Sequence, residues 1–430
     1  MVAGEAEHPS RVIVGERGWS LWGRCIALGV TGSAAVYKSL DLARLLMRYG
    51  ATVVPVLTRS ASSLVSPSLF EWATGVRPVA GEFTGGIEHV ALARRCDALL
   101  VAPATLEALA EIAGLHASNP VTALAQEMLG LGRPVLLVPA MHEGMWRRAG
   151  RLVEELEASG AYVMRPLVET GQAKYPDVEL VAWWAESLVL RGRDLEGLRV
   201  LVTAGPTREH IDDVRVITNP STGLMGVSLA LEAAWRGARV RLVHGPLCCC
   251  RWRGWRLYLE AAAAVETTEE MLVESLRLAS GGIDAAVYAA AAADYRVRGR
   301  RGGKIPTAAG PVTLELEPTP KVIEAVASRH PGALHYGFTA EPLTGEELLA
   351  KAREKLERYR LDAVAANSTV EPGAGFASET NHVYSLDWRG RVFEYRGSKR
   401  EVARAVLDHA AWLLWRGELN PARAGGAGER

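Results

Sequence analysis

The stretch at residues 200–226 constrains the fold more than any other part of the chain. A short apolar run at 200–202 breaks into the turn 203–207, which contains a glycine and a proline. A second polar loop at 219–223 precedes a predicted helix at 224–236. An apolar strand, a glycine-containing turn and a helix are typical of a parallel sheet that binds phosphate at its carboxyl edge, where helix N–H groups favour an anion. From the residues alone, we give an ordinary βα loop equal weight.

The same pattern occurs near the start of the chain. An apolar run at 24–30 ends in the turn 29–33, and a helix is predicted at 34–49. The glycine spacing differs from GxGxxG, so a flavin mononucleotide or another monophosphate fits better than NAD. Further apolar runs at 53–57, 97–101 and 135–138 alternate with helical segments. This alternation predicts a doubly wound, flavodoxin-like α/β sheet.

A second series of strands and helices begins at 198–202. A chain of 430 residues exceeds what one hydrophobic core usually holds. A charged, glycine-containing break at 191–194 separates the two series. We therefore predict two domains, at 20–190 and 196–418, followed by a disordered tail from 420.

Composition excludes several classes of protein. The formal net charge of +0 argues against nucleic-acid partners. No apolar run has the length of a transmembrane helix, and residues 1–20 lack a signal-peptide core. The cysteines lack metal-ligand spacing: Cys25 and Cys96 are predicted to be core residues, and 248–250 form a loop run. The sequence favours a soluble protein of a reducing compartment, the cytoplasm, with no membrane partner.

The stretch TAGPTREHIDDVRVITNPSTGLMG, which begins at Thr203, resembles a known enzyme family. It is similar to the ligase half of the bifunctional phosphopantothenoylcysteine decarboxylase/phosphopantothenate–cysteine ligases of coenzyme A biosynthesis. The match is much longer, and so more specific, than a lone GxGxxG. The resemblance covers roughly residues 22–410. It implies an FMN-dependent decarboxylase domain of the HFCD flavoprotein type, followed by a Rossmann-like ligase domain.

In the first half, the resemblance implies an FMN site. GVTGSAAVYK, which begins at Gly29, looks like the family's phosphate loop, and APAT at 102–105 matches a flavin-contacting segment. The implied FMN contacts are Gly32, Ser33, Thr58, Ser60, Ala102 and Thr105. His89 falls where the family has its essential histidine, although a histidine in a polar turn is most often a surface residue.

Three positions of the first half depart from the family pattern. The substrate-binding asparagine corresponds to Asn119 only if one residue is inserted. In the family's PAMN-x-x-Met segment, which implies Met141 as a substrate contact, His142 replaces the asparagine. Lys174 stands where a mobile clamp usually carries a cysteine.

The third departure bears on the implied chemistry. Direct loss of carbon dioxide from a cysteine carboxylate would leave an unstabilised carbanion, and oxidation of the thiol by the flavin provides an electron sink. The resulting enethiolate must then be protonated and reduced, a step that the family assigns to the clamp cysteine. Lys174 can donate a proton or hold a phosphate or carboxylate, but it cannot act as a thiol. Either Lys174 is the acid or this half-reaction is altered.

In the second half, the resemblance implies a nucleotide site that includes the loop at Gly205. Asp294 and Lys304 reproduce the family's CAAxADY…Lys spacing, with Lys304 leaving a basic loop that could close over a triphosphate. Phe338 lies in a segment similar to GFAAE and is expected to contact the base. Lys355, seven residues before Asp362, is at the position of a triphosphate lysine.

Other positions of the second half concern the substrate and a departure from the family. Asn219 would donate to phosphopantothenate or to the acyl-phosphate oxygen, and Arg215 would bind substrate or position its loop. A second triphosphate lysine of the family is replaced by Tyr359, between Arg358 and Arg360.

The implied ligase reaction has two steps. The carboxylate of 4′-phosphopantothenate attacks the α-phosphate of a nucleotide, pyrophosphate leaves, and the amine of cysteine attacks the mixed anhydride. Lys304 and Lys355 would neutralise phosphate oxygens that Mg²⁺ bridges, with no dedicated metal ligands in the protein. Fused microbial members resemble CTP users, so we expect CTP rather than ATP. The family also suggests trimers through the first half and dimers through the second, hence a dodecamer.

Two other classes of function were weighed. An NAD-dependent dehydrogenase is disfavoured because neither glycine loop has the GxGxxG spacing. A regulatory flavoprotein without catalytic activity is disfavoured by His89 and by the intact ligase motifs. A narrower alternative is an active ligase fused to a flavoprotein domain whose decarboxylation is impaired or which has a regulatory role.

Overall fold

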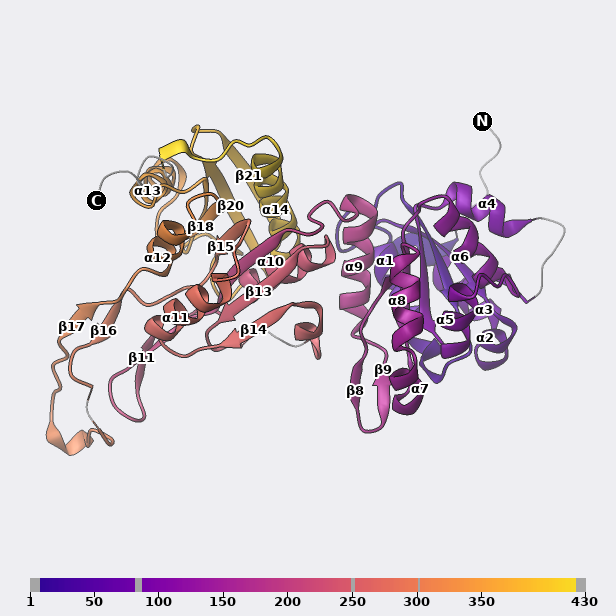
Figure 1. Cartoon of the computed structure of the whole chain (residues 1–430), viewed down its shortest axis with the longest axis horizontal. Coiled ribbons are helices and arrows are strands. Elements are labelled where there is room, and N and C mark those ends of the chain that lie inside the picture. The colour runs from indigo at the N-terminus through magenta and orange to yellow at the C-terminus, as the bar shows by residue number, and fades with distance from the viewer. Residues whose placement is uncertain (1–7, 82–86, 249–251, 301, 423–430) are drawn as a thin grey trace. The chain divides into compact units, whose positions relative to one another are not determined.

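The computed structural model describes residues 8–81, 87–248, 252–300 and 302–422. The chain forms two compact units, each with its own sheet (Figure 1). Unit 1 comprises Met1–Gly192 and Trp252–Leu257, and unit 2 comprises Arg193–Arg251 and Tyr258–Arg430. A short segment from the second half of the sequence is therefore part of unit 1.

Unit 1 is built on a six-stranded parallel sheet with the order β3-β2-β1-β4-β5-β7. Its strands are β1 (Cys25–Val30), β2 (Thr52–Leu57), β3 (Val79–Ala80), β4 (Ala98–Ala104), β5 (Val135–Pro139) and β7 (Tyr162–Val163). Without the two-residue edge strand β3, this is the 2-1-3-4-5 order of flavodoxin-like sheets. The predicted fold of the first half is confirmed.

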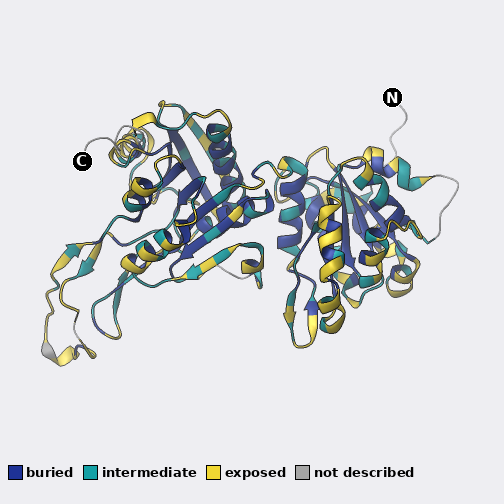
Figure 2. Ribbon diagram, viewed as in Figure 1, coloured by how far each residue is buried: buried dark blue, intermediate teal, exposed yellow. Residues whose placement is uncertain are grey.

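Helices cover both faces of this sheet. On one face lie α4 (Glu88–Arg95), α5 (Leu106–Ala113), α6 (Pro120–Gly130) and α8 (Gly150–Ala158). On the other lie α1 (Tyr37–Arg48), α3 (Pro67–Thr74) and α9 (Val178–Arg191), which pack together. The remaining elements are η1 (Pro9–Ile13), η2 (Ala34–Val36), α2 (Arg59–Leu64), α7 (Glu143–Arg148) and a small antiparallel sheet of β6 (Met141–His142), β9 (Gln172–Lys174) and β8 (Leu167–Glu169). Because both faces are covered, β1, β4 and β5 are buried along their whole length (Figure 2).

Unit 2 has an eight-stranded sheet with the order β14-β13-β10-β15-β18-β19-β20-β21. Its strands are β10 (Arg199–Ala204), β13 (Arg239–His244), β14 (Ala261–Ala264), β15 (Ala285–Tyr288), β18 (Leu334–Glu341), β19 (Ala363–Ser368), β20 (Thr380–Asp387) and β21 (Val392–Ser398). The strands from β14 to β19 run parallel in the 3-2-1-4-5-6 order of dinucleotide-binding sheets, and β20 and β21 add an antiparallel edge. The predicted Rossmann-like class is confirmed.

The other elements of unit 2 surround this sheet or extend from it. The helices are α10 (Leu224–Trp235), α11 (Thr268–Ala279), α12 (Val322–Arg329), α13 (Gly345–Arg358) and α14 (Lys399–Trp415), with the 3-10 helix η4 (Thr307–Ala309). The 3-10 helix η3 (Trp255–Tyr258) belongs to unit 1 except for its last residue. Two antiparallel ribbons, β11 (Arg208–His210) with β12 (Val216–Thr218) and β16 (Tyr295–Val297) with β17 (Leu316–Pro318), extend beyond the carboxyl edge of the sheet (Figure 1).

Two predicted segments differ from the structure. The helix expected at 34–49 begins as the short 3-10 helix η2, because the Ser33 hydroxyl accepts a hydrogen bond from the Ala35 N–H at 3.3 Å and tightens the first turn. The segment 102–105, expected to follow its strand, lies largely within β4, because Ala104 still pairs with Pro139 of β5. The Ala102–Pro103 peptide bond is cis. Most of the predicted tail, 423–430, lies outside the described residues.

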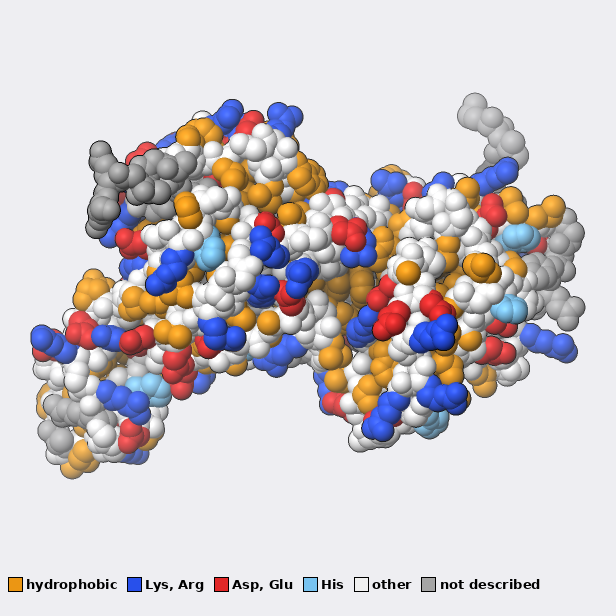
Figure 3. Space-filling model, viewed as in Figure 1, with side chains coloured by type: hydrophobic (Ala, Val, Ile, Leu, Met, Phe, Trp, Pro, Cys, Tyr) orange, Lys and Arg blue, Asp and Glu red, His pale blue; other side chains and the backbone are white. Residues whose placement is uncertain are grey.

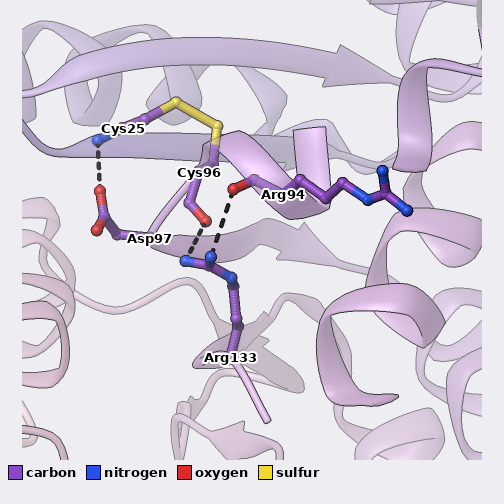
Figure 4. The surroundings of a disulfide bond; sticks show 5 residues. All are labelled: Cys25, Arg94, Cys96, Asp97 and Arg133. Atoms are coloured by element: carbon purple, nitrogen blue, oxygen red, sulfur yellow. Dashed lines mark hydrogen bonds between the residues drawn. A yellow bond between two sulfur atoms is a disulfide. The ribbon is translucent and has the colours of Figure 1, made fainter. Parts of the chain in front are cut away.

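Cys25 and Cys96, which the sequence predicts only as core residues, form a disulfide bond (Figure 4). Both are buried as expected. Cys25 begins β1 and Cys96 lies just ahead of the neighbouring strand β4, so their Cα atoms are 4.4 Å apart. Asp97 accepts the Cys25 N–H at 2.8 Å, and Arg133 donates to the Cys96 carbonyl at 3.1 Å. The inference of a reducing compartment from cysteine usage loses its basis.

The other features of the chain concern its remaining cysteines, its surface charge and its helices. Cys248 is exposed and free, and the predicted loop cysteines at 249 and 250 lie outside the described residues. Basic and acidic side chains are interspersed on the face seen in Figure 3, in keeping with the net charge of +0. No helix in the described part of the chain combines the length and apolar character that a bilayer crossing needs.

The disulfide predicts a measurable stabilisation. It closes a loop of 71 residues, for which the chain-entropy account gives roughly 4 kcal/mol. Peptide mapping of unreduced protein should yield one linked peptide containing Cys25 and Cys96, and Cys96→Ser should lower the free energy of unfolding by about 2–4 kcal/mol. Cys248→Ser, which removes an exposed free thiol, is the matched control. Recovery of both peptides unlinked from unreduced protein would contradict the pairing.

Candidate active sites at two sheet edges

The loops that follow β1, β2 and β4 meet at the carboxyl edge of the unit 1 sheet. Gly32 and Ser60 are so close that a Cβ atom on Gly32 would lie 2.6 Å from the Ser60 Cβ. Thr31 donates to the Pro103 carbonyl at 2.8 Å and accepts the Thr105 N–H at 3.0 Å. Since parallel strands end at the same edge, the six predicted flavin residues share one region: Gly32, Ser33, Thr58, Ser60, Ala102 and Thr105.

At this edge, side-chain hydroxyl groups cap the N-termini of three helices. Ser33 caps η2, Thr58 caps α2 through the Ala61 N–H at 3.2 Å, and Thr105 caps α5 through the Ala108 N–H at 3.3 Å. Helix starts present backbone N–H groups that favour an anion. The crowded glycine at position 32 leaves no side chain between the loops, and hydroxyl donors surround it. This donor set fits the phosphate and polar ring edge of a flavin mononucleotide.

Lys174 and Met141 lie together on the small sheet beside this edge. Met141 of β6 pairs with Ala173 of β9, the residue before Lys174. The Lys174 ammonium contacts the Glu169 carboxylate at 3.3 Å. The clamp expected from the sequence is thus the β8–β9 hairpin (Figure 1).

Lys38 adds a second cation that the sequence reasoning did not single out. Its ammonium donates to the Tyr175 carbonyl at 3.3 Å, next to Lys174. Burial lowers the pKa of Lys38, the nearby Asp177 carboxylate raises it, and the charge of Lys174 lowers it. The only sequence signal for Lys38 is its place at the end of the GVTGSAAVYK stretch.

His89 and Asn119 lie on two helices that pack against each other, α4 and α6. The Asn119 side chain caps α6, since its oxygen accepts the N–H groups of Val121 and Thr122 at 3.0 and 3.1 Å. Its amide donates to Glu111 at 2.9 Å. The capping role explains why a polar residue stands there, and the predicted roles of His89 in catalysis and Asn119 in substrate binding stay predictions.

Unit 2 has a cavity of about 400 Å³ at the carboxyl edge of its sheet. It lies where β10 and β15 are adjacent and the strand order reverses, which is where open α/β sheets bind ligands. Among the predicted residues, Asn219, Asp294, Phe338 and Lys355 line it. Residues that the sequence reasoning did not single out also line it, including Lys321 and Lys399.

Hydrogen bonds between the loops after β10 and β15 shape this cavity. The Ala291 N–H donates to the Gly205 carbonyl at 2.9 Å, and the Ala293 N–H donates to the Thr207 hydroxyl at 2.8 Å. The Asn219 amide donates to the Ala291 carbonyl at 3.0 Å. Gly205 has φ +75°, a backbone conformation that favours glycine.

A close approach of α10 to β10 brings the start of that helix to the cavity. A Cβ atom on Gly226 would lie 2.4 Å from the Ala204 Cβ, so only glycine allows this packing. Ser221, Thr222 and Gly223, ahead of α10, line the cavity. The helix start is therefore available to a phosphate group.

Charged side chains gather on the other side of the cavity. The half-buried Lys355 side chain donates through its ammonium group to the Phe338 carbonyl. Burial lowers the pKa of Lys355, the Asp294 and Glu341 carboxylates raise it, and the charge of Lys321 lowers it. Lys321 forms an ion pair with Asp294. A partly buried lysine next to a second cation favours an anionic ligand.

Lys304, Arg215 and Gly205 do not line the cavity, although the sequence predicts all three in the site. Lys304 is exposed, and its neighbour Ile305 is bonded to the loop before β12: its N–H donates to Asp212 at 3.1 Å and its carbonyl accepts from Arg215 at 3.1 Å. Arg215 also pairs with Asp212 at 2.8 Å. These bonds join Arg215 to the segment that carries Lys304, and its two predicted roles, substrate binding and positioning of its loop, stay predictions.

The remaining cavity cation, Lys399, follows the helix cap Ser398 and is buried. Its ammonium donates to the carbonyls of Gly375 and Phe376, both at 3.0 Å. The Phe376 carbonyl also accepts from the Thr222 hydroxyl at 3.3 Å. Helical periodicity places Lys399 at a helix start but carries no signal for these contacts from distant loops.

Comparisons with known proteins agree with this division. A flavoprotein family model matches residues 20–186, and the model of the DNA/pantothenate metabolism flavoprotein C-terminal domain matches residues 195–413. The coenzyme A biosynthesis bifunctional protein CoaBC of Thermococcus kodakarensis is 38% identical over 419 residues, which is 95% of this chain and 100% of that protein. The chain belongs to the CoaBC family.

Other CoaBC proteins are similar along most of the chain. That of Methanocaldococcus jannaschii is 31% identical, covering 95% of this chain and 99% of its own, and that of Bacillus subtilis is 32% identical, covering 88% and 92%. The crystal structure of a CoaBC C-terminal domain aligns with a TM-score of 0.42 at 31% identity, covering 52% of this chain and 99% of that domain. As a member of this family, the chain is a bifunctional enzyme with a flavoprotein decarboxylase half and a ligase half. The family relationship supports this reading over a ligase fused to an inactive flavoprotein domain.

The Asp212 carboxylate predicts a pH dependence of stability. Burial alone would raise its pKa, but the N–H groups of Val214, Arg215 and Ile305 and the Arg215 charge lower it from 3.8 to about 2. Because the pKa is lower in the folded state, Asp212 stabilises the fold above about pH 4, and this contribution is lost as the pH falls through 2. Between pH 2 and pH 4, Asp212 makes the unfolded protein bind more protons than the folded protein, so the free energy of unfolding rises with pH. Asp212→Asn should remove this difference of up to about one proton and so flatten the slope, which denaturant titrations measure. Equal slopes for the two proteins would contradict the assignment.

Proposed function

We propose that unit 2 joins 4′-phosphopantothenate to cysteine at the expense of CTP, and that unit 1 decarboxylates the product with FMN to give 4′-phosphopantetheine. The observation that carries the ligase proposal is the cavity at the strand-order reversal, where Asn219, Asp294, Phe338 and Lys355 meet. The polar carboxyl edge of the unit 1 sheet, next to the hairpin that carries Lys174, supports the decarboxylase half.

In the ligase, the chain's residues mostly neutralise and orient charge. Lys355 stabilises triphosphate oxygens from a partly buried position, where charges are screened less than at the surface. The start of α10 holds a second phosphate, and Lys304 closes over the α-phosphate from the loop that Asp212 and Arg215 position. Asp294 contacts the ribose or base, and Phe338 packs against the base. Asn219 donates to the acyl-phosphate oxygen while cysteine's amine attacks.

Mg²⁺ fits this site as a companion of the triphosphate. No cluster of three or more His, Cys, Asp or Glu side chains in the described part of the chain could hold a metal. Magnesium commonly keeps several waters and binds through substrate phosphates rather than a protein cage. The cavity lysines therefore need only hold the nucleotide with which the ion enters.

In the decarboxylase, Ser33, Thr58, Ser60 and Thr105 would hold the phosphate and ring edge of FMN, with Gly32 and Ala102 allowing close approach. When bound, FMN would supply the electron sink for the substrate thiol and the electrons for the final reduction. Met141 and Asn119 position the substrate, and His89 orients its carboxylate. Lys174 donates the proton to the enethiolate that remains after carbon dioxide leaves.

We also propose that the enzyme is a homo-oligomer, with trimers formed through unit 1 and dimers through unit 2, together a dodecamer. Apolar side chains exposed on α2 and α3 support self-association of unit 1: Leu64, Leu69 and Trp72.

The ligase proposal predicts the effect of removing Lys355. Lys355→Ala should lower kcat/KM for CTP about 100-fold or more, because a charge that stabilises developing phosphate charge is lost. Phosphopantothenate-dependent pyrophosphate release is the measurement, and CTP should exceed ATP as substrate for the unaltered enzyme. Lys351→Ala, on the same helix with an exposed ion pair to Glu354, should change the rate less than twofold. An unchanged kcat/KM in Lys355→Ala would show that the nucleotide does not bind in this cavity.

The decarboxylase proposal predicts the effect of replacing Lys174. With phosphopantothenoylcysteine supplied directly, Lys174→Ala should slow phosphopantetheine formation about 100-fold, as loss of a general acid does. Lys174→Cys should restore part of the rate by the thiol route that the family resemblance implies. The control is Arg151→Ala, which removes an exposed arginine of α8 that is ion-paired with Glu155. A wild-type rate in Lys174→Ala would show that another group supplies the proton.

A further inference from the structure

A tryptophan- and arginine-rich segment of the second half has no role in the ligase cavity. This segment, Trp252–Leu257, lies in sequence between β13 and β14 but belongs to unit 1. We call Trp252–Leu257 the strap. The chain on either side of it belongs to unit 2.

Two buried tryptophans anchor the strap. Trp252 and Trp255 are 7% and 4% exposed. The Trp252 ring packs edge-on against Trp183 of α9 at a centroid distance of 5.6 Å, and its indole N–H donates to Glu179 of α9 at 3.0 Å. The Trp252 ring is packed and its buried indole N–H has a hydrogen-bond partner, so the strap is held against α9 by specific contacts.

The strap also touches the hairpin that carries Lys174. Gly254 has φ +76°, and a Cβ atom there would lie 3.3 Å from the Leu167 Cβ of β8. Next to it, the Arg253 guanidinium donates to one oxygen of Glu169, Oε1, at 2.6 Å. Glu169 is the last residue of β8 and pairs with Gln172 across the hairpin.

One carboxylate therefore joins the strap to Lys174. While Oε1 of Glu169 accepts from Arg253, its other oxygen, Oε2, contacts the Lys174 ammonium at 3.3 Å. The contact of Arg253 with Glu169 is one hydrogen bond between charged groups, which is stronger than a bond between neutral groups. Glu169 thus links Arg253 on one side to Lys174 on the other.

We infer that the strap positions the decarboxylase hairpin: Arg253 orients Glu169, and Glu169 holds Lys174 where it protonates the decarboxylated substrate. Arg253 is a positioning residue, since it acts through Glu169. The inference rests on the proposed function of unit 1. It assigns to a segment from the ligase half of the sequence a part in the reaction of the other half.

The step concerned has a distinct chemical signature. Oxidation of the substrate thiol removes two hydrogens, and loss of carbon dioxide leaves an enethiol with two hydrogens fewer than 4′-phosphopantetheine. Protonation at carbon and return of two electrons from the reduced flavin complete the product. If Lys174 is misplaced, this last step slows, and the enethiol should accumulate and be seen by mass spectrometry.

The test supplies phosphopantothenoylcysteine to the full-length holoenzyme. Arg253→Ala should lower kcat about tenfold with little change in KM and should accumulate the enethiol, and Arg253→Lys should recover most of the rate. Arg253 is 71% exposed, so the variant should fold, and unchanged flavin content and pyrophosphate release check this. Arg151→Ala is the matched control for loss of a surface arginine.

A double-variant cycle separates positioning from a general structural effect. If Arg253 acts through Glu169, Arg253→Ala combined with Glu169→Gln should be no slower than Glu169→Gln alone. Full additivity of the two effects, or a wild-type kcat in Arg253→Ala, would overturn the inference. If the unaltered enzyme itself fails to convert phosphopantothenoylcysteine, the proposed function of unit 1 fails, and the inference with it.

Discussion

The ligase cavity depends on the bonding of two loops that leave adjacent parallel strands in different directions. The loop after β10 and the loop after β15 are joined by the contacts of Ala291 with Gly205 and with Asn219. These bonds hold the two loops together at the edge where the strand order reverses, and so define one side of the cavity. With them, the start of α10 lies on one side and Lys355 on the other. A helix start and a partly buried cation are both features that favour an anionic ligand.

The same constraint organises unit 1 with different chemistry. Its loops after β1, β2 and β4 are tied by Thr31 and by the contact of Gly32 with Ser60. Here the edge offers hydroxyls and helix caps rather than cavity lysines, and the cations, Lys38 and Lys174, stand beside it near the hairpin. One sheet architecture therefore supports two reactions because the loops, and not the strands, carry the chemistry.

Local patterns predicted most of the fold and part of each site. Strand, glycine turn and helix are signals within about 30 residues, so both sheets and residues such as Ser33 and Thr58 could be placed from the sequence and the family resemblance. Contacts over longer separations carry no such signal. Cys25 and Cys96 are 71 residues apart, and Trp252 bonds Glu179 from the other half of the chain. Lys304 was expected at the cavity but lies outside its lining. The next residue, Ile305, is hydrogen-bonded to Asp212 and Arg215, which lie in a loop distant in sequence.

The central claim is that one chain performs both reactions in sequence. The most direct measurement incubates the purified protein with 4′-phosphopantothenate, cysteine, CTP and Mg²⁺ and follows the products by mass spectrometry. The account predicts 4′-phosphopantetheine with release of carbon dioxide and pyrophosphate, despite the lysine in place of a clamp cysteine. Accumulation of phosphopantothenoylcysteine alone would contradict the decarboxylase half of the account.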